Sequence, residues 1–448
     1  MIDTKKIFIL FFHFTFLIST SFSFSIPGTY STDSLDERRK GVKILLSIWD
    51  SNKVTGDIES AIYISKLGQE LISVISQQTK NYDFFLLDED EINAFATWNG
   101  LIGINNGLVL FTENESELAA IIAHEISHVE LEHLKRYQSK SENQQLITIG
   151  GVLASILVKD NEITEAILTS TIANDLQKHI DYTREHEIEA DNYAIKIISK
   201  TNFNSNALST FFRRMSDNST AKDFLRTHPS NIERISNVFG RIKMHNSHYD
   251  NFEYEAMKIR IAIENNFPLE LKNQSQNLYS NAYSLLKQGK LKEALKLADS
   301  LLEINSSFSS LILAGRIYAH NLQLSRSLSC FEQASHIRDD EIIKFYRAKS
   351  FFLNEKYNQA ESYLKKFLKT NKSSIYTQKL MAEIYLKLGR MDRYHFHYGE
   401  MELLKVSFKK AIKHLNYAKK ITSDKDFSDL IDHNISNIEN QKKLLIDY

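Results

Sequence analysis

A repeat with a period of 33 to 34 residues runs through the C-terminal part of the chain. Small residues recur at Ala294, Ser327 and Ala360, each 33 residues apart, and Tyr394 stands 34 residues further on. One unit of this length forms a pair of helices that cannot bury its apolar face alone, so successive pairs must stack on one another. The period therefore predicts a helical solenoid whose concave surface is suited to binding a partner.

A period of about 34 residues with paired helices is typical of tetratricopeptide repeats. The pattern begins at Pro268, so we assign residues 268–448 to a tetratricopeptide-repeat domain. A last helix pair is expected from Glu400 to Ile421, with Ala411 and Ala418 at its small positions. Because the proline that usually ends each repeat is absent, an irregular α-helical solenoid is the alternative.

The N-terminus has the three-part layout of a secretory signal peptide. Lys5 and Lys6 precede an apolar run from Ile7 to Ile18, and small residues follow. This run is shorter than the roughly 20 residues that span a bilayer as a helix. We therefore expect residues 1–25 to be a signal peptide and the mature chain to be exported, with an uncleaved N-terminal anchor as the alternative. The single cysteine, Cys330, excludes an internal disulfide and is expected to be a small core residue of a repeat.

Residues 26–260 are expected to form a separate domain that is mainly α-helical with a small β-sheet. The spacing of apolar residues predicts helix from Ser34 to Gln78 and from Thr183 to Lys200. Between them, the stretch from Tyr82 to Phe111 contains short β-type runs. The turn pair Asn99-Gly100 within this stretch predicts a hairpin.

Neither a membrane nor a nucleic acid is predicted as the main partner. The apolar run from Leu146 to Val158 is too short to cross a bilayer, so we expect a core helix, or otherwise a flap or interfacial helix beside the active site. The formal net charge of −1 gives no reason to expect nucleic acid. Peripheral contact with a membrane stays open.

Residues 119–134, AAIIAHEISHVELEHL, contain two histidines four residues apart, His124 and His128. Positions i and i+4 share one face of a helix, so both imidazoles can reach one ion. Zinc accepts imidazole nitrogen readily and prefers four ligands. Glu125 follows the first histidine and is the candidate general base that activates a water molecule. The small apolar residues before His124 suit a buried catalytic helix.

A third zinc ligand must come from elsewhere in the chain. Metzincin enzymes place glycine at the position of Leu131 and histidine at the position of Leu134, so that class is excluded. The second helical segment offers Glu187 and Asp191, which are four residues apart and share a face. If Glu187 binds zinc, Asp191 can hydrogen-bond one of the zinc-binding histidines and orient it.

The same segment leaves alternatives open. Glu185 and Glu189 compete with Glu187 for the ligand role, and the whole run could be a solvated charged face. The small residues Ala190 and Ala194 favour the ligand hypothesis, because they let this helix approach the histidine helix closely.

The two segments together resemble the metallopeptidase family of the CAAX prenyl endopeptidase and the heat-shock protease HtpX. That family pairs H-E-x-x-H with a later E-x-x-x-D, often with arginine three residues before the glutamate. The matching residues are His124, Glu125, His128, Arg184, Glu187 and Asp191. The stretch from Ile92 to Leu108 resembles the family's strand beside the cleft, although Trp98-Asn99-Gly100 replaces its usual Pro-Gly-Gly. Residues Thr227 to Ile235 resemble its downstream H-P segment, with His228 and Arg234 at the matching positions.

The resemblance implies a zincin-type domain with one zinc ion per chain. His124, His128 and Glu187 would be the metal ligands and Glu125 the base. His228 matches a histidine that can approach the zinc. It could restrain the enzyme as a fourth ligand, steady the oxyanion of the transition state, or be an ordinary loop residue.

The order of signal peptide, catalytic domain and repeats is similar to that of the family's periplasmic members. The similarity implies a zinc endopeptidase with a chaperone-like role, which degrades outer-membrane β-barrel proteins or helps them mature. Its repeats would contact the barrel-assembly machinery. The alternative is a restrained or inactive protease domain that serves as a tetratricopeptide chaperone or adaptor. The intact Glu125 argues against an inactive domain.

Overall fold

The computed structural model describes residues 34–76, 80–140, 173–216, 228, 251–368 and 374–446. Across these residues the fold is mainly α-helical with one three-stranded sheet, as the sequence predicts. The expected signal peptide, the apolar run from Leu146 to Val158 and Arg234 lie outside the described residues.

The helical stretch predicted from Ser34 forms two helices rather than one. Helix α1, Leu35–Asp50, begins with a capping box in which Ser34 and Glu37 exchange hydrogen bonds. Helix α2, Ile58–Ser73, begins at Asp57, whose side chain accepts a hydrogen bond from a backbone N–H of the first turn. Asn52 separates the helices because it adopts a left-handed conformation, with φ 56°.

The sheet contains the predicted hairpin. Strand β2, Ala94–Ala96, pairs antiparallel with β3, Leu101–Asn105, and β1, Asp83–Leu87, pairs parallel with the other side of β3. Asn99 and Gly100 have φ values of 61° and 67°, which is the left-handed pair that a type I′ turn requires. The stretch from Tyr82 to Phe111, in which strands were expected, ends in a helix. Its last residues form α3, Asn106–Phe111.

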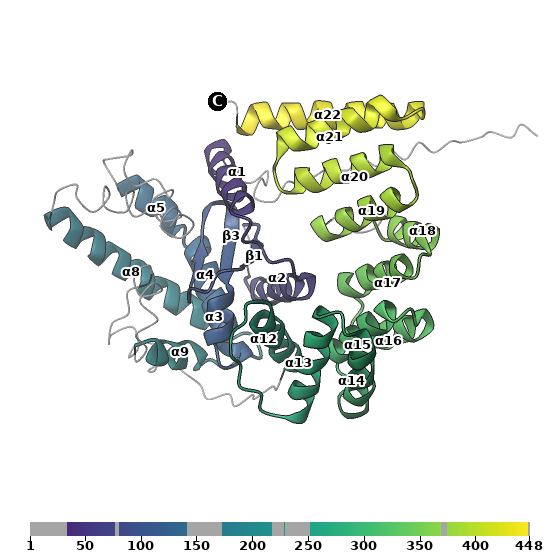
Figure 1. Cartoon of the computed structure of the whole chain (residues 1–448). Coiled ribbons are helices and arrows are strands. Elements are labelled where there is room, and N and C mark those ends of the chain that lie inside the picture. The colour runs from purple at the N-terminus through teal and green to yellow at the C-terminus, as the bar shows by residue number, and fades with distance from the viewer. Residues whose placement is uncertain are drawn as a thin grey trace, which may run out of the picture.

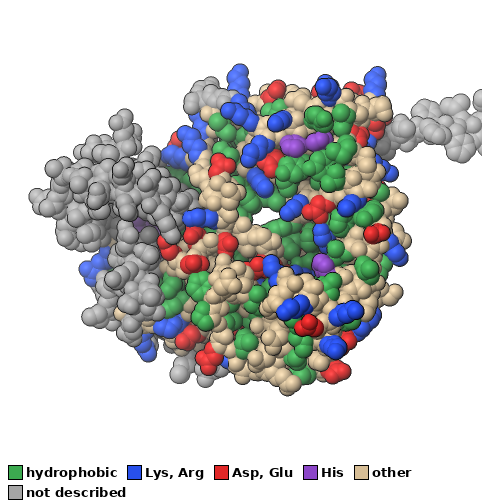
Figure 2. Space-filling model, viewed as in Figure 1, with side chains coloured by type: hydrophobic (Ala, Val, Ile, Leu, Met, Phe, Trp, Pro, Cys, Tyr) green, Lys and Arg blue, Asp and Glu red, His purple; other side chains and the backbone are tan. Residues whose placement is uncertain are grey.

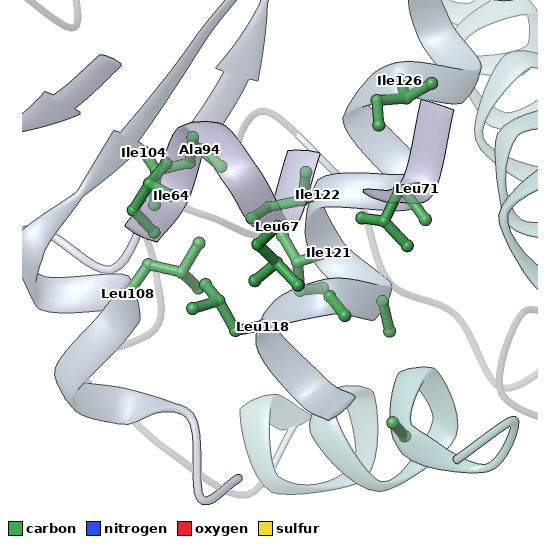
Figure 3. Packing of buried hydrophobic residues seen from close by; sticks show 14 of the residues in the cluster. Ile64, Leu67, Leu71, Ala94, Ile104, Leu108, Leu118, Ile121, Ile122 and Ile126 are labelled. Atoms are coloured by element: carbon green, nitrogen blue, oxygen red, sulfur yellow. The ribbon is translucent and has the colours of Figure 1, made fainter. Parts of the chain in front are cut away.

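Helix α4, Glu115–Glu130, lies at the centre of the N-terminal part and packs against α2, β2 and the long helix α8, Ala173–Ile198. Helix α9, Ala207–Ser216, also covers α4. Figure 3 shows how apolar side chains from α2, α3, α4 and the sheet meet in one cluster: Ile64, Leu67, Leu71, Ala94, Ile104, Leu108, Leu118, Ile121, Ile122 and Ile126. This packing fixes the face that α4 turns toward α8.

The C-terminal part is a series of antiparallel helix pairs that follows α12, Phe252–Glu264 (Figure 1). The helices are α13 Gln274–Lys287, α14 Leu291–Ile304, α15 Phe308–His320, α16 Leu324–Ile337, α17 Glu341–Leu353, α18 Tyr357–Leu368, α19 Ile375–Lys387, α20 Met391–Leu404, α21 Phe408–Ile421 and α22 Lys425–Leu445. The predicted small positions Ala294, Ser327 and Ala360 are fully buried, and Cys330 is a core residue.

The helix pair expected between Glu400 and Ile421 begins earlier than predicted. Glu400 lies inside α20, which begins at Met391 and packs against α21, and a further helix, α22, follows and continues to Leu445. Ala411 and Ala418 are both fully buried on α21, where small residues were expected.

The solenoid curves around the N-terminal part and contacts it at both ends. Near its start, Arg260 of α12 donates hydrogen bonds to Asp57 and Ser60, and Arg316 of α15 forms an ion pair with Glu59. At its far end, α21 and α22 share a hydrophobic cluster with α1 and the hairpin. Between these contacts the molecule is hollowed by a cavity of about 410 Å³, which is visible as an opening in Figure 2.

Candidate metal centre

The buried face of α4 carries the two histidines that the sequence singled out. Asn114 caps the helix by accepting a hydrogen bond from the backbone N–H of Glu117, at 3.1 Å. His124 is fully buried and Glu125 is 1% exposed, whereas His128 is half-buried one turn further on. The Nε2 atoms of His124 and His128 lie 3.0 Å apart, so both rings point at the same small volume.

Helix α8 brings the carboxylates to this volume. Glu187 and Asp191 are both buried. The small residues Ala190 and Ala194 of the same helix are buried as well. Glu187 places its carboxylate 3.3 Å from Nε2 of His124 and 3.4 Å from Nε2 of His128. The predicted pair of facing helices is therefore present in the fold.

His228 completes the cluster from a distant part of the chain. Its Nδ1 atom lies 3.4 Å from Nε2 of His124 and 3.2 Å from each carboxylate oxygen of Glu187. Its Nε2 atom lies 3.4 Å from Oε1 of Glu125. The ring of His228 therefore contacts both the other cluster residues, through Nδ1, and the candidate base, through Nε2.

The four side chains His124, His128, Glu187 and His228 fit a metal ion. Their candidate ligand atoms all lie within 4.8 Å of one another. Bonds of about 2.0–2.1 Å in a tetrahedron would separate the ligand atoms by roughly 3.3–3.4 Å, and the shortest contacts here are 3.0 to 3.4 Å. Three imidazoles and one carboxylate are also a donor set that suits zinc.

The buried His124 and Glu187 side chains are stabilised in their charged forms by neighbouring groups rather than by water. Burial opposes a charge on His124, but hydrogen bonds to Asp191 and Glu187 outweigh it and raise the pKa of His124 to about 10. Burial likewise opposes a charge on Glu187, yet the neighbouring histidines hold its pKa well below the usual range. The carboxylate is thus ionised and available to a cation.

Each metal-facing histidine has a second contact behind it. Nδ1 of His124 lies 3.0 Å from Oδ1 of Asp191, the residue that was expected to orient one of the histidines. His128 has its Nδ1 atom 2.9 Å from Nδ1 of His133, the first residue of α5, His133–Lys140. Burial, together with the charges of His128 and His186, lowers the pKa of His133 to about 3.

His133 was not predicted from the sequence, and Glu189 was predicted only as a competing ligand. Glu189 lies outside the cluster and contacts His133 and Arg136 instead. Glu185 and Arg184 are exposed on α8. The spacing of His133, five residues after His128, was visible in the sequence. It predicts a contact with His128 only if the helix is known to break between them.

Comparison with known proteins agrees with this geometry. Residues 60–242 match the model described as Peptidase family M48. This part of the chain is therefore similar to an M48 peptidase domain. It includes most of α2, together with the sheet, α4 and α8, and thus every side chain of the metal cluster.

The most similar relatives include the beta-barrel assembly-enhancing proteases. The protein of that name from Escherichia coli is 35% identical over 185 residues, which cover 40% of this chain and 38% of the relative. The one from Yersinia pestis is 32% identical over 262 residues, 54% of each chain. A putative member from Vibrio cholerae is 34% identical over 189 residues, 41% of this chain and 39% of the relative. The chain thus spans about half, or less, of the length of these curated relatives.

Among the helices that the structure describes, none is both long enough and apolar enough to cross a membrane.

Proposed function

We propose that the M48 domain is a zinc-dependent endopeptidase, with His124, His128 and Glu187 as the metal ligands and Glu125 as the base. The observation that supports it best is the cluster of three imidazoles and one carboxylate around a single point, with Glu125 beside it. A zinc ion held there would supply a Lewis acid that polarises the peptide carbonyl. Glu125 would take the proton of the attacking water and pass it to the leaving amine.

The hairpin beside α4 is the proposed place for the substrate. Strand β3 is paired on both sides, whereas β2 has no strand on its outer edge in the described part of the sheet. The edge of Ala94–Ala96 can therefore pair with an extended peptide. A cavity of about 50 Å³ between the hairpin and α4, lined in part by Ala96, Trp98, His128 and Val129, can take a substrate side chain.

Backbone pairing reads little side-chain identity, so it suits an enzyme that acts on unfolded strands. Its relatives are named for enhancing β-barrel assembly. We propose by this similarity that the chain acts in the periplasm, where it degrades outer-membrane β-barrel proteins or helps them mature. The repeats, assigned as a domain from residue 268, would bind the substrate or the barrel-assembly machinery along their concave side.

Cleavage of an unfolded protein by the zinc-loaded chain tests this proposal. The purified protein should cut casein and an unfolded outer-membrane barrel protein, and removal of the metal by a chelator should stop both reactions until zinc is restored. If the zinc-loaded chain and its His228→Ala variant cut neither substrate but bind the barrel protein, the domain is an adaptor rather than a protease.

The position of His228 predicts that the resting enzyme is restrained. Its ring lies between His124 and Glu125, where the attacking water must stand. His228→Ala should raise basal casein hydrolysis or self-cleavage. If roughly a tenth of the molecules are competent at rest, the increase would be on the order of 10-fold.

His228→Gln serves as a second variant, because glutamine keeps a hydrogen-bond donor but is a poor zinc ligand. Both variants should be faster than the parent if His228 acts as a restraint, with zinc content measured alongside. A lower rate at full zinc occupancy in the alanine variant alone would instead support the oxyanion role. Equal rates in all three proteins would leave His228 an ordinary loop residue.

A further inference from the structure

A chain of polar side chains leads from His128 to the surface, on the side away from the metal cluster. His133 is 4% exposed, and its ring stacks on that of His186 with centroids 4.2 Å apart and an interplanar angle of 5°. Its Nδ1 atom faces Nδ1 of His128 at 2.9 Å, and its Nε2 atom lies 3.1 Å from Glu189. Arg136 donates hydrogen bonds to both carboxylate oxygens of Glu189.

The direction of the hydrogen bonds follows from the position of the metal cluster. Nε2 of His128 faces His124 and Glu187, so a neutral His128 that binds a metal through Nε2 carries its proton on Nδ1. That proton is donated to Nδ1 of His133. His133 then carries its own proton on Nε2 and donates it to Glu189.

The two metal-facing histidines are therefore held in different ways. His124 contacts a buried carboxylate directly, through Asp191. His128 contacts an imidazole, and the nearest carboxylate in that direction, Glu189, is one residue further away. Carboxylate, carbonyl or water contacts of this kind fix the tautomer and ring orientation of a ligand histidine.

We propose that His133 is a positioning residue for His128, and that Glu189 and Arg136 act on the metal site only through His133. This inference rests on the proposed zinc site. The 43% exposed Glu189 and 42% exposed Arg136 side chains are screened by water, so their effect should be smaller than that of His133.

The zinc dissociation constant, measured by competition with a chelator, tests the role of His133. His133→Phe keeps a flat ring against His186 but removes both nitrogens, and it should weaken zinc binding about 10- to 100-fold. His133→Asn offers an amide oxygen to Nδ1 of His128 and should recover part of the affinity. Glu185→Gln is the matched control, since Glu185 is exposed on the same helix as Glu189, and it should bind zinc as the parent does.

Two further measurements separate positioning from a merely structural role. The melting temperature of the metal-free protein should be similar in the phenylalanine variant and the control. The visible spectrum of the cobalt-loaded protein should change in the phenylalanine variant, because the orientation of His128 around the metal changes. Unchanged affinity and an unchanged spectrum would overturn the proposal.

A double-mutant cycle tests whether Glu189 acts through His133. Glu189→Gln alone should weaken zinc binding by less than His133→Phe does, and in the His133→Phe background it should have no further effect. If the two losses multiply, Glu189 acts on the site by another route and that part of the proposal is wrong. If the parent protein itself binds no zinc, the metal site fails rather than the role of His133 within it.

Discussion

Glu125→Gln is expected to stop peptide hydrolysis while leaving the fold and the metal site intact. Glutamine has nearly the shape of glutamate but cannot accept the proton of the attacking water. Glu125 is not a member of the four-residue cluster, so its replacement removes no ligand. General-base catalysis contributes about 10²- to 10⁴-fold in rate, so a loss of roughly 3–5 kcal/mol in transition-state stabilisation is expected.

Casein hydrolysis, zinc content and melting temperature should be measured together for this variant. Glu185→Gln makes the same chemical change at an exposed position of the facing helix and should keep full activity. Undiminished turnover would exclude Glu125 as the base. A parallel loss of zinc would show that its carboxylate supports the metal site instead.

The repeats illustrate which part of the fold could be read from the sequence. The small positions were visible because two helices can pack closely only where side chains are small. The turns between paired helices were less visible. The same left-handed position is filled by Gly289 and Gly389 in two turns but by Leu322, Glu355 and Val406 in three others, with φ of 60°, 58° and 59°. Residues that rarely adopt this conformation give no turn signal, so the pair boundaries could not be fixed.

The candidate site was likewise predictable only in part from the sequence. His124 with His128, and Glu187 with Asp191, are each four residues apart within one helix, so helical geometry alone placed each pair on one face. His133 is five residues after His128 and would point elsewhere on a continuous helix. Glu132, with φ 52°, breaks the helix before α5, and His133 lies against His128.

The attachment of the solenoid to the M48 domain was also not predicted. It depends on charged residues far apart in sequence, such as Glu59 of α2 with Arg316 and Tyr346 of the repeats. A charged residue at the start of a helix ordinarily indicates a solvated helix end, and nothing in the sequence shows that another part of the chain will cover it. Such a buried ion pair is identified only when the partner is placed.

Glu187→Ala is expected to lower the affinity for zinc by about 100- to 1,000-fold and to abolish hydrolysis at ordinary zinc concentrations. Zinc binding at four-ligand structural sites is worth about 10–16 kcal/mol, so one ligand accounts for roughly 3–4 kcal/mol. The variant also removes the ionised carboxylate that neutralises the cation among three imidazoles. Metal analysis after dialysis and chelator competition measure the change.

Two neighbouring glutamates of α8 provide the comparison that decides the assignment. Glu185→Ala removes an exposed carboxylate and should leave zinc binding unchanged. Glu189→Ala should weaken binding far less than Glu187→Ala, because Glu189 lies outside the cluster and contacts His133. Full zinc occupancy in Glu187→Ala, or its loss in either of the other two, would mean that the third ligand is misassigned. The three carboxylates lie within five residues of one helix, so the one that faces α4 at 3.3–3.4 Å from both histidines should have by far the largest effect on zinc binding.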